Sequence, residues 1–475
     1  MKPTAEQQLI IDRITSSSES LAIEARAGGA KTTTLCLIAE ALGPIRILAL
    51  AFNKKIALEM AERLPTGVVS STINALGNKA WQEFRGRYHK INAKKMFEVL
   101  SYYGERIDEA DREEFFDRFS ETLKALRQAK TAGFVPSGAH PMMEGIIDEG
   151  DFFASLDEEP SDFQRDIIIK CLRTSIKMAF DGELDFDDQI YMSTLVKSVS
   201  FPTFDAVLVD EAQDLSELNH KMLRKIVKKA RLIAVGDPCQ AIYGFRGASE
   251  NSMDEMRGAF NLSTMYLTIC FRCAPEVVEA ARWRAPDMQP WPGTPAGQVI
   301  EHASWSHEEI FDGDAVICRN NYPLFRLALA LLRARRSPEL LSGDIIPGLV
   351  KVMKKLGKGK MPQAEALAAL TEWTEAEKAR SRAPDTVEDK AACIRLFLEE
   401  NTTLSEAIEA IEALAAAKGR IKLMTGHKSK GLEFNRVWFL DQHLCRPKGQ
   451  DLNVKYVIQT RAKQELHYID TDKMA

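Results

Sequence analysis

The segment from Ala25 to Thr32, ARAGGAKT, constrains the fold of this chain more than any other feature. It follows a short apolar run, Leu21 to Ile23, and precedes a stretch of helical character from Thr32 to Ala41. A glycine-bearing loop with a lysine between a strand and a helix has the spacing of a phosphate-binding loop, in which backbone N–H groups surround an anion. We expect Lys31 to neutralise β- and γ-phosphate oxygens and Thr32 to ligate Mg²⁺. The nucleotide-contacting residues predicted here are Ala27, Gly28, Gly29, Ala30, Lys31, Thr32 and Thr33.

One position of this loop departs from the pattern. Residue 30, just before the lysine, is alanine where glycine is expected. If Ala30 has a positive φ, its side chain costs about 1–2 kcal/mol. An ordinary strand–turn–helix with a chance lysine therefore stays open as the alternative interpretation of the loop taken alone.

Short apolar runs alternate with helical stretches on both sides of a long interruption. A strand is predicted at Ile45 to Leu50, and others at Ala206 to Val209 and Arg231 to Val235. Continuous apolar strands separated by helices are typical of a parallel sheet covered on both faces. The last two runs lead into Asp210 and Asp237. Because ligands of such sheets bind beyond the carboxyl ends of the strands, we expect Lys31 and both acids in one site.

The strand rhythm stops twice, which indicates two α/β lobes that each carry a helical insertion. Strand-like runs return at Ala315 to Ile317 and at Val437 to Leu440. The predicted bounds are 1–80 with 184–262 for the first lobe, 81–183 for its insertion, 263–338 with 416–475 for the second lobe, and 339–415 for a shorter insertion.

Two adjacent acids, Asp210 and Glu211, follow the strand that ends at Val209. In NTP hydrolysis, Asp210 would hold the Mg²⁺ that bridges the phosphates, and Glu211 would orient and polarise the attacking water. The alternative, an exposed acidic turn, fits poorly with four apolar strand residues directly before it.

The segment Asp210 to Asp214, DEAQD, together with the phosphate loop and further motifs in order, resembles superfamily 1 DNA helicases of the UvrD/Rep/PcrA type. The resemblance covers both α/β lobes and leaves out the insertions. It implies two RecA-like lobes of the P-loop NTPase class, ATP and Mg²⁺ as substrate and cofactor, and DNA-dependent ATPase activity. It also implies 3′–5′ movement along single-stranded DNA and binding to single-strand/duplex junctions.

The resemblance assigns nucleotide roles to residues in both lobes. Gln7 would recognise adenine, with Gln8 as the alternative, and Gln240 would sense the γ-phosphate. In the second lobe, Phe271 would stack on adenine, and Gly431 and Glu433 would face phosphate and ribose. Arg272 and Arg461 would act as arginine fingers, each of a kind worth about 10³–10⁵ in rate.

The same resemblance implies a surface for single-stranded DNA. Aromatic rings stack on bases without regard to sequence, and the alternative for a ring such as Tyr243 is core packing. The DNA-contacting residues that the motifs imply are Phe52, Asn53, Asn74, Tyr243, Phe245, Arg246, Thr425 and His427.

Composition narrows the class of protein without suggesting DNA. The net charge of −5 means that a nucleic-acid path has to be a local groove. No apolar run is long enough for a membrane span and no signal peptide begins the chain, so we expect a cytoplasmic protein without membrane contact. Cys270 and Cys273 form a single C-x-x-C, too few ligands for structural zinc, and are interpreted as incidental thiols.

Two other functions stay open from the sequence. A translocase that displaces proteins but barely unwinds DNA is suggested by the short second insertion. A DNA-binding module that does not hydrolyse nucleotide is suggested by Ala30. RNA as substrate and the biological pathway are left open.

Overall fold

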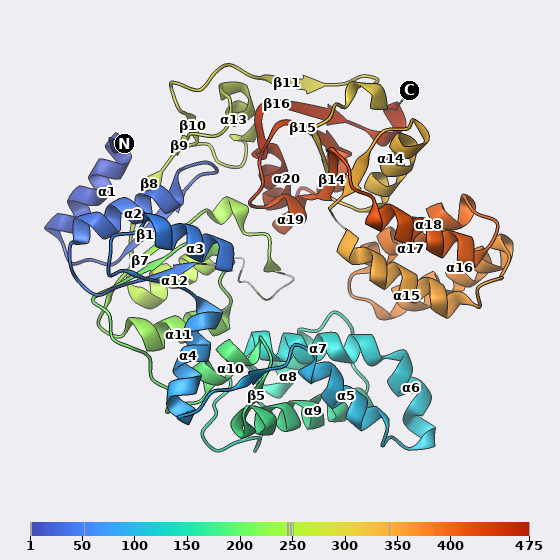
Figure 1. Cartoon of the computed structure of the whole chain (residues 1–475), viewed down its shortest axis with the longest axis horizontal. Coiled ribbons are helices and arrows are strands. Elements are labelled where there is room, and N and C mark those ends of the chain that lie inside the picture. Colours follow the sequence, from blue (N-terminus) through green and yellow to red (C-terminus); the bar gives the residue numbers. More distant parts are fainter. Residues whose placement is uncertain are drawn as a thin grey trace. The chain divides into compact units, whose positions relative to one another are not determined.

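The computed structural model describes residues 2–51, 53–244, 247, 249, 251–341 and 343–474 (Figure 1). The chain divides into two compact units. The first consists of Met1–Ala25 with Ala30–Leu267, and the second of Arg26–Gly29 with Thr268–Ala475.

The first unit is built on a six-stranded, wholly parallel sheet. Its strand order is β3-β2-β6-β7-β1-β8. The strands are β1 (Leu21–Ala25), β2 (Ile47–Ala51), β3 (Val69–Thr72), β6 (Ala206–Val209), β7 (Arg231–Gly236) and β8 (Ser263–Leu267).

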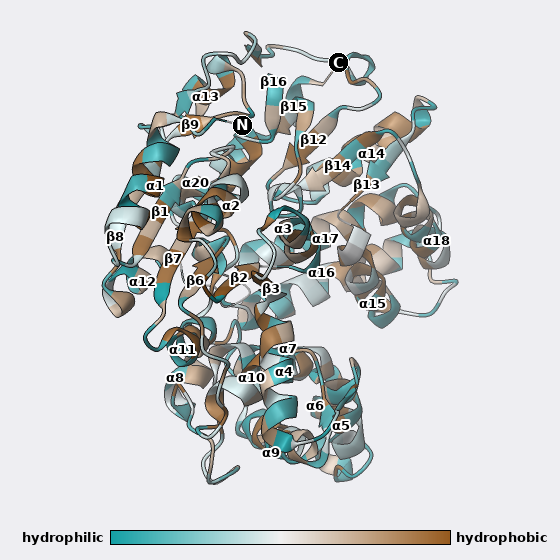
Figure 2. Cartoon of the chain, turned by 60° about the vertical axis from the view of Figure 1, so that its left-hand side comes forward, coloured by the Kyte–Doolittle hydropathy of each residue, from teal (hydrophilic) through white to brown (hydrophobic). Residues whose placement is uncertain are grey.

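Helices cover both faces of this sheet, because alternate strand residues point to opposite sides and those of the central strands β2, β6 and β7 are nearly all apolar. In β2, Leu48 and Leu50 belong to one buried cluster, whereas Ile47 and Ala49 belong to another. Figure 2 shows the apolar character of these strands. The helices α1 (Ala5–Ser16), α2 (Lys31–Leu42) and α3 (Lys54–Arg63) contribute to the cluster on one face. The cluster on the other face includes α4 (Ile73–Arg85), α10 (Asp188–Leu195), α11 (Glu217–Val227) and α12 (Ser252–Phe260).

A mostly helical insertion, grouped in Figure 1, belongs to the first unit and has a core of its own. Its elements are β4 (Lys90–Ile91), α5 (Lys95–Gly104), α6 (Arg112–Asp117), α7 (Phe119–Ala132), α8 (Glu149–Ala154), α9 (Asp162–Asp181) and β5 (Glu183–Leu184). Buried ion pairs tie it to α10: Asp188 lies 2.6 Å from the Nζ of Lys95 and 2.7 Å from that of Lys130. Leaving one of these charges unpaired would be costly, so the pairs fix the insertion on the lobe.

The second unit repeats the plan with another six-stranded parallel sheet, in the order β11-β16-β15-β12-β14-β13. Its strands are β11 (Gln298–Glu301), β12 (Ala315–Cys318), β13 (Pro338–Leu340), β14 (Ile421–Thr425), β15 (Phe434–Leu440) and β16 (Ala462–Ile469). A separate two-stranded ribbon pairs β9 (Ile269–Cys270) with β10 (Gln289–Pro290).

The helices of the second unit fall into two sets. Around the sheet lie α13 (Pro275–Ala281), α14 (Tyr322–Arg333), α19 (Gly426–Ser429) and α20 (Gln450–Gln459). The helices between β13 and β14 are α15 (Ile346–Leu356), α16 (Gln363–Arg380), α17 (Pro384–Glu399) and α18 (Leu404–Ala416). They share one continuous core with residues of β12, β14 and β15, including Val316, Leu423 and Trp438.

The predicted fold class, α/β with two parallel-sheet lobes, is confirmed. One boundary differs from our expectation. We placed residues from 263 onward in the second lobe, but Ser263–Leu267 forms β8 and pairs with β1 in the first sheet. This edge strand is only partly buried, so it lacks the continuous apolar run that announces a central strand. In the part of the chain described, no helix has the length and apolarity needed to cross a membrane.

Candidate functional site

Four of the residues expected around a nucleotide meet at the carboxyl ends of the strands in the first unit. Lys31 begins α2 after β1, and Asp210 follows β6. The Nζ of Lys31 lies 2.9 Å from the Oε2 of Glu211. The hydroxyl of Thr32 donates to the Oδ2 of Asp210 at 3.0 Å. The structure therefore brings these four side chains together. The strand pattern predicts this for Lys31 and Asp210, and the third predicted residue, Asp237, is close enough for its charge to act on Lys31.

Ala30 has a positive φ, the case in which its side chain is expected to cost conformational energy. Its φ is 54° and its ψ 39°, in the left-handed region, and it stands at the N-cap of α2. Its carbonyl accepts from the backbone N–H of Thr34 at 2.9 Å. Glu211 also has a left-handed backbone, with a φ of 52°. Two non-glycine residues of the site are thus held in a conformation that L-amino acids normally avoid.

Burial and neighbouring charge set the electrostatics of the acidic pair. Asp210 is 3% exposed. Burial, together with the negative charge of Glu211, raises its pKa to about 6 although Lys31 and the Thr32 hydroxyl act in the opposite direction. For Lys31, burial disfavours the ammonium, but the carboxylates of Glu211, Asp237 and Asp210 outweigh it and raise the pKa. Lys31 is therefore a cation throughout the physiological range.

These residues fit a magnesium-bound triphosphate. Thr32 and Asp210 present a hydroxyl and a carboxylate oxygen side by side, which are ligand types that Mg²⁺ prefers. A carboxylate destabilised by burial gains from a cation, and the Lys31 ammonium is a partner for phosphate oxygens.

Three further predicted residues have defined places in the first unit. Gln7 is buried, accepts from the Thr4 N–H at 3.0 Å and donates to the Thr34 hydroxyl at 3.0 Å, which links α1 to α2. The Thr33 hydroxyl accepts from Arg63 of α3 at 2.7 Å. Gln240 is buried and donates to the Asp237 carboxylate at 2.6 Å.

Two of the DNA-contacting residues expected in the first unit line the same cavity. Asn74 and Tyr243 line a cavity of about 190 Å³ together with Asp187, Asp214 and other residues. Asn53 instead caps α3, where its side chain accepts from the Ile56 N–H at 2.9 Å. Three residues assigned to DNA, Phe52, Phe245 and Arg246, lie outside the described residues.

Sequence reasoning missed one exposed aromatic residue, Phe186, which is hydrogen-bonded to Asn74. The side-chain amide of Asn74 donates to the Phe186 carbonyl at 3.1 Å, and the Phe186 side chain is 58% exposed. An exposed ring next to a residue assigned to DNA suits base stacking. The signal was present as an aromatic between acids in Asp185 to Asp188, but no spacing rule singled it out.

In the second unit, another exposed aromatic ring lies beside Phe271, the predicted adenine-stacking residue. Phe271 is 39% exposed, and its ring centroid lies 5.0 Å from that of Trp291, which is 40% exposed. Trp291 follows β10, and its backbone N–H donates to the Cys270 carbonyl at 2.9 Å. Sequence reasoning missed Trp291, because its only signal is one aromatic between prolines, far from any motif.

The first residues of the phosphate loop group with this unit. The Gly28 carbonyl accepts from the Phe271 N–H at 3.0 Å, and the Ala27 N–H donates to the Tyr456 hydroxyl at 3.1 Å. A Cβ at Gly28, whose φ is 71°, would come within 2.8 Å of the Cys270 sulfur and of the Arg272 Cβ. Glycine is therefore required at this position. Gly29 donates to the Arg26 carbonyl at 2.8 Å.

The two predicted arginine fingers differ in their surroundings. Arg272 pairs with Glu433 at 2.8 Å, which joins two residues predicted to contact nucleotide. Arg461 is 1% exposed and donates to the carbonyls of Val457 and Leu432, each at 3.0 Å.

The remaining predicted residues of the second unit lie near the end of β14 and beyond it. Gly431 has a φ of 83°, Thr425 ends β14 as the N-cap of α19, and His427 lies half-buried within α19.

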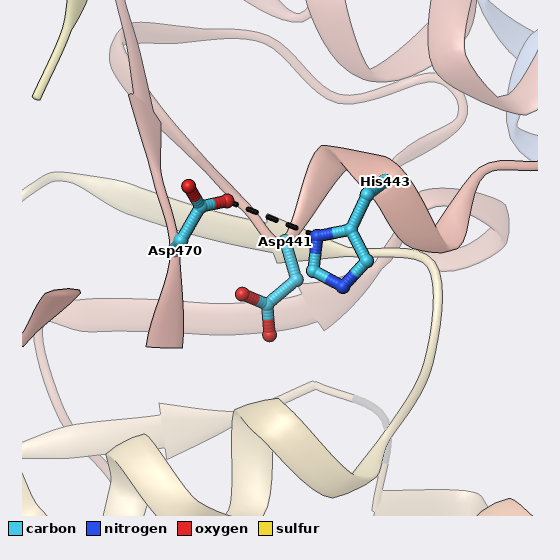
Figure 3. A group of neighbouring side chains, drawn as sticks. All are labelled: Asp441, His443 and Asp470. Carbon is cyan, nitrogen blue, oxygen red and sulfur yellow. Dashed lines mark ion pairs between the residues drawn. The ribbon is translucent and has the colours of Figure 1, made fainter. Parts of the chain in front are cut away.

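A separate cluster of metal-ligand side chains, Asp441, His443 and Asp470, lies in the second unit (Figure 3). The Asp441 carboxylate accepts from the Thr471 N–H at 2.6 Å, and Asp470 pairs with Lys473 at 2.7 Å. The His443 ring lies 3.8 Å from Asp470. These partners already satisfy the acids, so the cluster is a structural arrangement of strand ends. The cysteines are free and buried, and the Sγ of Cys270 accepts from the backbone N–H of Cys273 at 3.3 Å.

Two parallel sheets, a phosphate loop and an acidic pair at strand ends define a P-loop NTPase of two lobes. The profile of the UvrD/REP helicase N-terminal domain matches residues 5–261, more than half of the chain. The chain therefore belongs to the UvrD/REP helicase family, as the motifs predicted.

Curated relatives agree with this assignment. F-box DNA helicase 1 of Gallus gallus is 24% identical over 95% of this chain and 46% of its own length. F-box DNA helicase protein 1 of Schizosaccharomyces pombe is 23% identical over 98% of this chain and 57% of its own. ATP-dependent DNA helicase UvrD1 of Mycobacterium bovis is 25% identical over 55% of this chain and 36% of its own length. The chain thus matches about half or less of the length of most of these relatives. A solved arterivirus helicase, nonstructural protein 10, aligns over 97% of this chain and 62% of its own, with 11% identity and a TM-score of 0.35, a likeness too distant to carry an argument.

Proposed function

We propose that this chain is an ATP-driven DNA helicase that moves 3′ to 5′ along single-stranded DNA and separates duplexes at single-strand/duplex junctions. The observation that carries the proposal is the convergence of Lys31, Thr32, Asp210 and Glu211. A cation, a hydroxyl and two acids at one sheet edge supply what phosphoryl transfer to water requires. The names of the relatives and the family support DNA as the substrate.

Each side chain has a distinct task in this proposal. Lys31 would neutralise β- and γ-phosphate oxygens, and Thr32 with Asp210 would hold a Mg²⁺ ion, which would supply Lewis-acid stabilisation of the phosphate charge. Glu211 orients the attacking water and polarises it. In this structure the Lys31 ammonium forms an ion pair with the Glu211 carboxylate. ATP binding would draw Lys31 to the phosphates and release the carboxylate to bind water.

The second unit would contribute the remaining nucleotide contacts. The exposed ring of Phe271 would stack on adenine, and Arg272 would leave Glu433 for the γ-phosphate while Glu433 turns to the ribose. Arg461 would serve as the second arginine finger. Closing on ATP and opening after hydrolysis would then move the lobes along the strand. Tyr243, Asn74, Thr425 and His427 would hold that strand.

The decisive experiment measures phosphate release with and without single-stranded DNA, followed by unwinding of duplexes with a 3′ or a 5′ overhang. We expect DNA to stimulate turnover and only the 3′ overhang to support unwinding. Turnover without unwinding would leave a translocase that displaces proteins. Absence of turnover at saturating ATP and DNA would favour the non-hydrolysing module that the strained Ala30 suggests.

Two substitutions separate binding from chemistry at this site. Glu211→Gln should keep nucleotide and DNA binding while turnover falls by about 100-fold or more, because the amide cannot act as the water-polarising base. Lys31→Ala should instead weaken nucleotide binding, because it removes the cation that faces the phosphates. Equilibrium binding of a fluorescent ATP analogue, beside phosphate release, distinguishes them. Normal turnover of the Glu211→Gln variant would remove Glu211 from the mechanism.

A further inference from the structure

Gln213 is a buried glutamine that none of the motif assignments includes. It lies in the short 3-10 helix Ala212–Asp214 that follows the acidic pair, and it is 1% exposed. Its side-chain amide spans two loops. The Nε2 donates to the Oε2 of Glu211 at 2.5 Å, and the Oε1 accepts from the backbone N–H of Asp237 at 2.9 Å.

The orientation of this amide follows from its partners. A backbone N–H can only donate, so the atom that faces Asp237 has to be the carbonyl oxygen. The NH₂ group is then forced toward Glu211. The Oε2 of Glu211 consequently accepts from the Gln213 amide and also from the Lys31 ammonium at 2.9 Å. If Lys31 turns to the phosphates of ATP, as the proposed function requires, the Gln213 amide would still hold the carboxylate.

A matched glycine makes room for the glutamine. Gly236 is the last residue of β7. A Cβ built there would lie 2.7 Å from the Oε1 of Gln213 and 2.9 Å from the sulfur of Met253, closer than real contacts allow, and 3.0 Å from the backbone nitrogen of Gln213. The Gln213 amide therefore fits only because residue 236 has no side chain.

The hydrogen-bonded chain continues toward the residues assigned to DNA. The Asp237 carboxylate accepts from the Cys239 N–H at 3.0 Å and from the Gln240 amide at 2.6 Å. Asp237 is 0% and Gln240 6% exposed, so these bonds have little competition from water. Tyr243, beside the cavity shared with Asn74, follows three residues later.

We propose that Gln213 is a positioning residue that holds the Glu211 carboxylate for ATP hydrolysis and ties its orientation to the Asp237–Gln240 segment. The inference rests on the proposed function, in which Glu211 orients water. A shift of the segment at Asp237, produced by DNA beside Tyr243, moves the Gln213 amide and with it the Glu211 carboxylate. Gln213 itself is buried, so in this proposal it acts through Glu211 and not on phosphate or DNA.

The test compares Gln213→Met, which keeps the length of the side chain and removes both hydrogen bonds, with the unmodified protein. We expect the kcat for DNA-stimulated phosphate release to fall about tenfold to a hundredfold, the range for a misplaced catalytic group. The affinity for a fluorescent ATP analogue should change less than twofold. The ratio of DNA-stimulated to basal turnover should also fall. Gly236→Ala should reproduce these changes, because its methyl group displaces the Gln213 oxygen.

Two controls distinguish positioning from a general loss of structure. Gln164→Met removes another buried amide, which caps α9 in the insertion, and should lower the melting temperature without lowering kcat. In a Glu211→Gln background, Gln213→Met should have no further effect on single-turnover hydrolysis, because a residue that acts through Glu211 is not additive with it.

Three results would overturn the proposal: a Gln213→Met protein with normal kcat, a kcat loss matched by Gln164→Met, or an undiminished loss in the Glu211→Gln background. If Gln213→Met does not fold, Gly236→Ala and the shape-preserving Gln213→Glu give the same comparison. Absence of turnover in the unmodified protein would contradict the proposed function instead.

Discussion

Strained backbone flanks the site on both sides. Ala30 precedes Lys31 and Glu211 follows Asp210, and both have a φ above +50°. Each costs about 1–2 kcal/mol for a residue with a Cβ. Such strain persists only where surrounding contacts hold it. For Ala30, those contacts include the first hydrogen bonds of α2, so the start of the helix and the conformation of the loop are fixed together.

Ala30→Gly should stabilise the protein. Glycine relieves the left-handed strain of about 1–2 kcal/mol in the folded state. It also stabilises the unfolded chain by about 0.5–1 kcal/mol, because glycine has more conformational freedom there. We expect a net gain of up to about 1 kcal/mol and a small rise in melting temperature, measured by thermal unfolding. Ala41→Gly in α2, where the backbone is helical, should do the reverse. Equal destabilisation by both substitutions would show that Ala30 is not strained.

Some side chains of the site could be predicted because they are adjacent in sequence to strand ends. Lys31, Thr32, Asp210 and Glu211 belong to two short motifs whose geometry follows from a parallel sheet. Gln213 and Trp291 could not be given a role in this way. Their importance depends on partners distant in the chain, Asp237 for one and Phe271 for the other, and no local pattern encodes such pairs.

The aromatic pair on the β9–β10 ribbon provides a test of how this unit takes adenine. If Trp291 extends the surface of Phe271, then Trp291→Leu should weaken nucleotide binding by about twofold to tenfold, as expected for a ring contact of 0.5–1.5 kcal/mol. Binding of a fluorescent ATP analogue measures it. Trp283→Leu is the matched control, because Trp283 is 44% exposed in the same unit but bonds to Gln459 instead. Equal affinity of the two variants would remove Trp291 from the nucleotide site.

An ion pair across β13 and β14 predicts how the second unit responds to acid. Glu339 and Lys422 face each other in register, with 2.5 Å between their charged atoms. The hydrogen bond from Lys422, followed by that from Lys418 and the Gly419 N–H, lowers the pKa of Glu339 to about 2. A lowered carboxyl pKa contributes stability above the unfolded value of 4.5 that is lost as the pH falls toward 2.

Glu339→Gln should therefore lower the free energy of unfolding at pH 7 by about 1 kcal/mol, after allowance for solvent screening. The difference from the unmodified protein should shrink between pH 4.5 and pH 2, where Glu339 itself becomes neutral. Thermal unfolding at pH 7 and pH 3 measures it. Glu372→Gln on the exposed face of α16 is the control. A difference that stays constant with pH would mean that the ion pair contributes nothing.

Central strands were predictable and edge strands were not. Residues of β2, β6 and β7 are buried on both faces, so each is a continuous apolar run that only a covered sheet accommodates. In contrast, β3 and β8 lie at the two edges of the first sheet and are partly exposed. Their composition overlaps that of loops, which explains why the boundary after residue 262 was wrong.

The two units share one plan although they share no evident repeat in sequence. Each has six parallel strands with a helical segment inserted between strands. The overall charge of −5 gave no sign of nucleic acid, and only the motifs at strand ends suggested it. The function that we propose therefore rests on few side chains in each unit, while the remaining sequence specifies the scaffold.

If the molecule is a motor, its ATP and DNA sites have to be energetically linked. When one ligand changes the affinity of a protein for a second ligand by some factor, the second ligand changes the affinity for the first by the same factor. This coupling typically amounts to about 5–150-fold. We expect a non-hydrolysable ATP analogue to change the affinity for single-stranded DNA at least about fivefold, and DNA to change the affinity for the analogue equally. Fluorescence titrations in both directions measure the two factors at one salt concentration. Glu211→Gln should keep the coupling with ATP itself, because it removes hydrolysis and leaves binding. A factor of one in both directions would mean that the two ligands bind independently, and hydrolysis could then do no work on the strand.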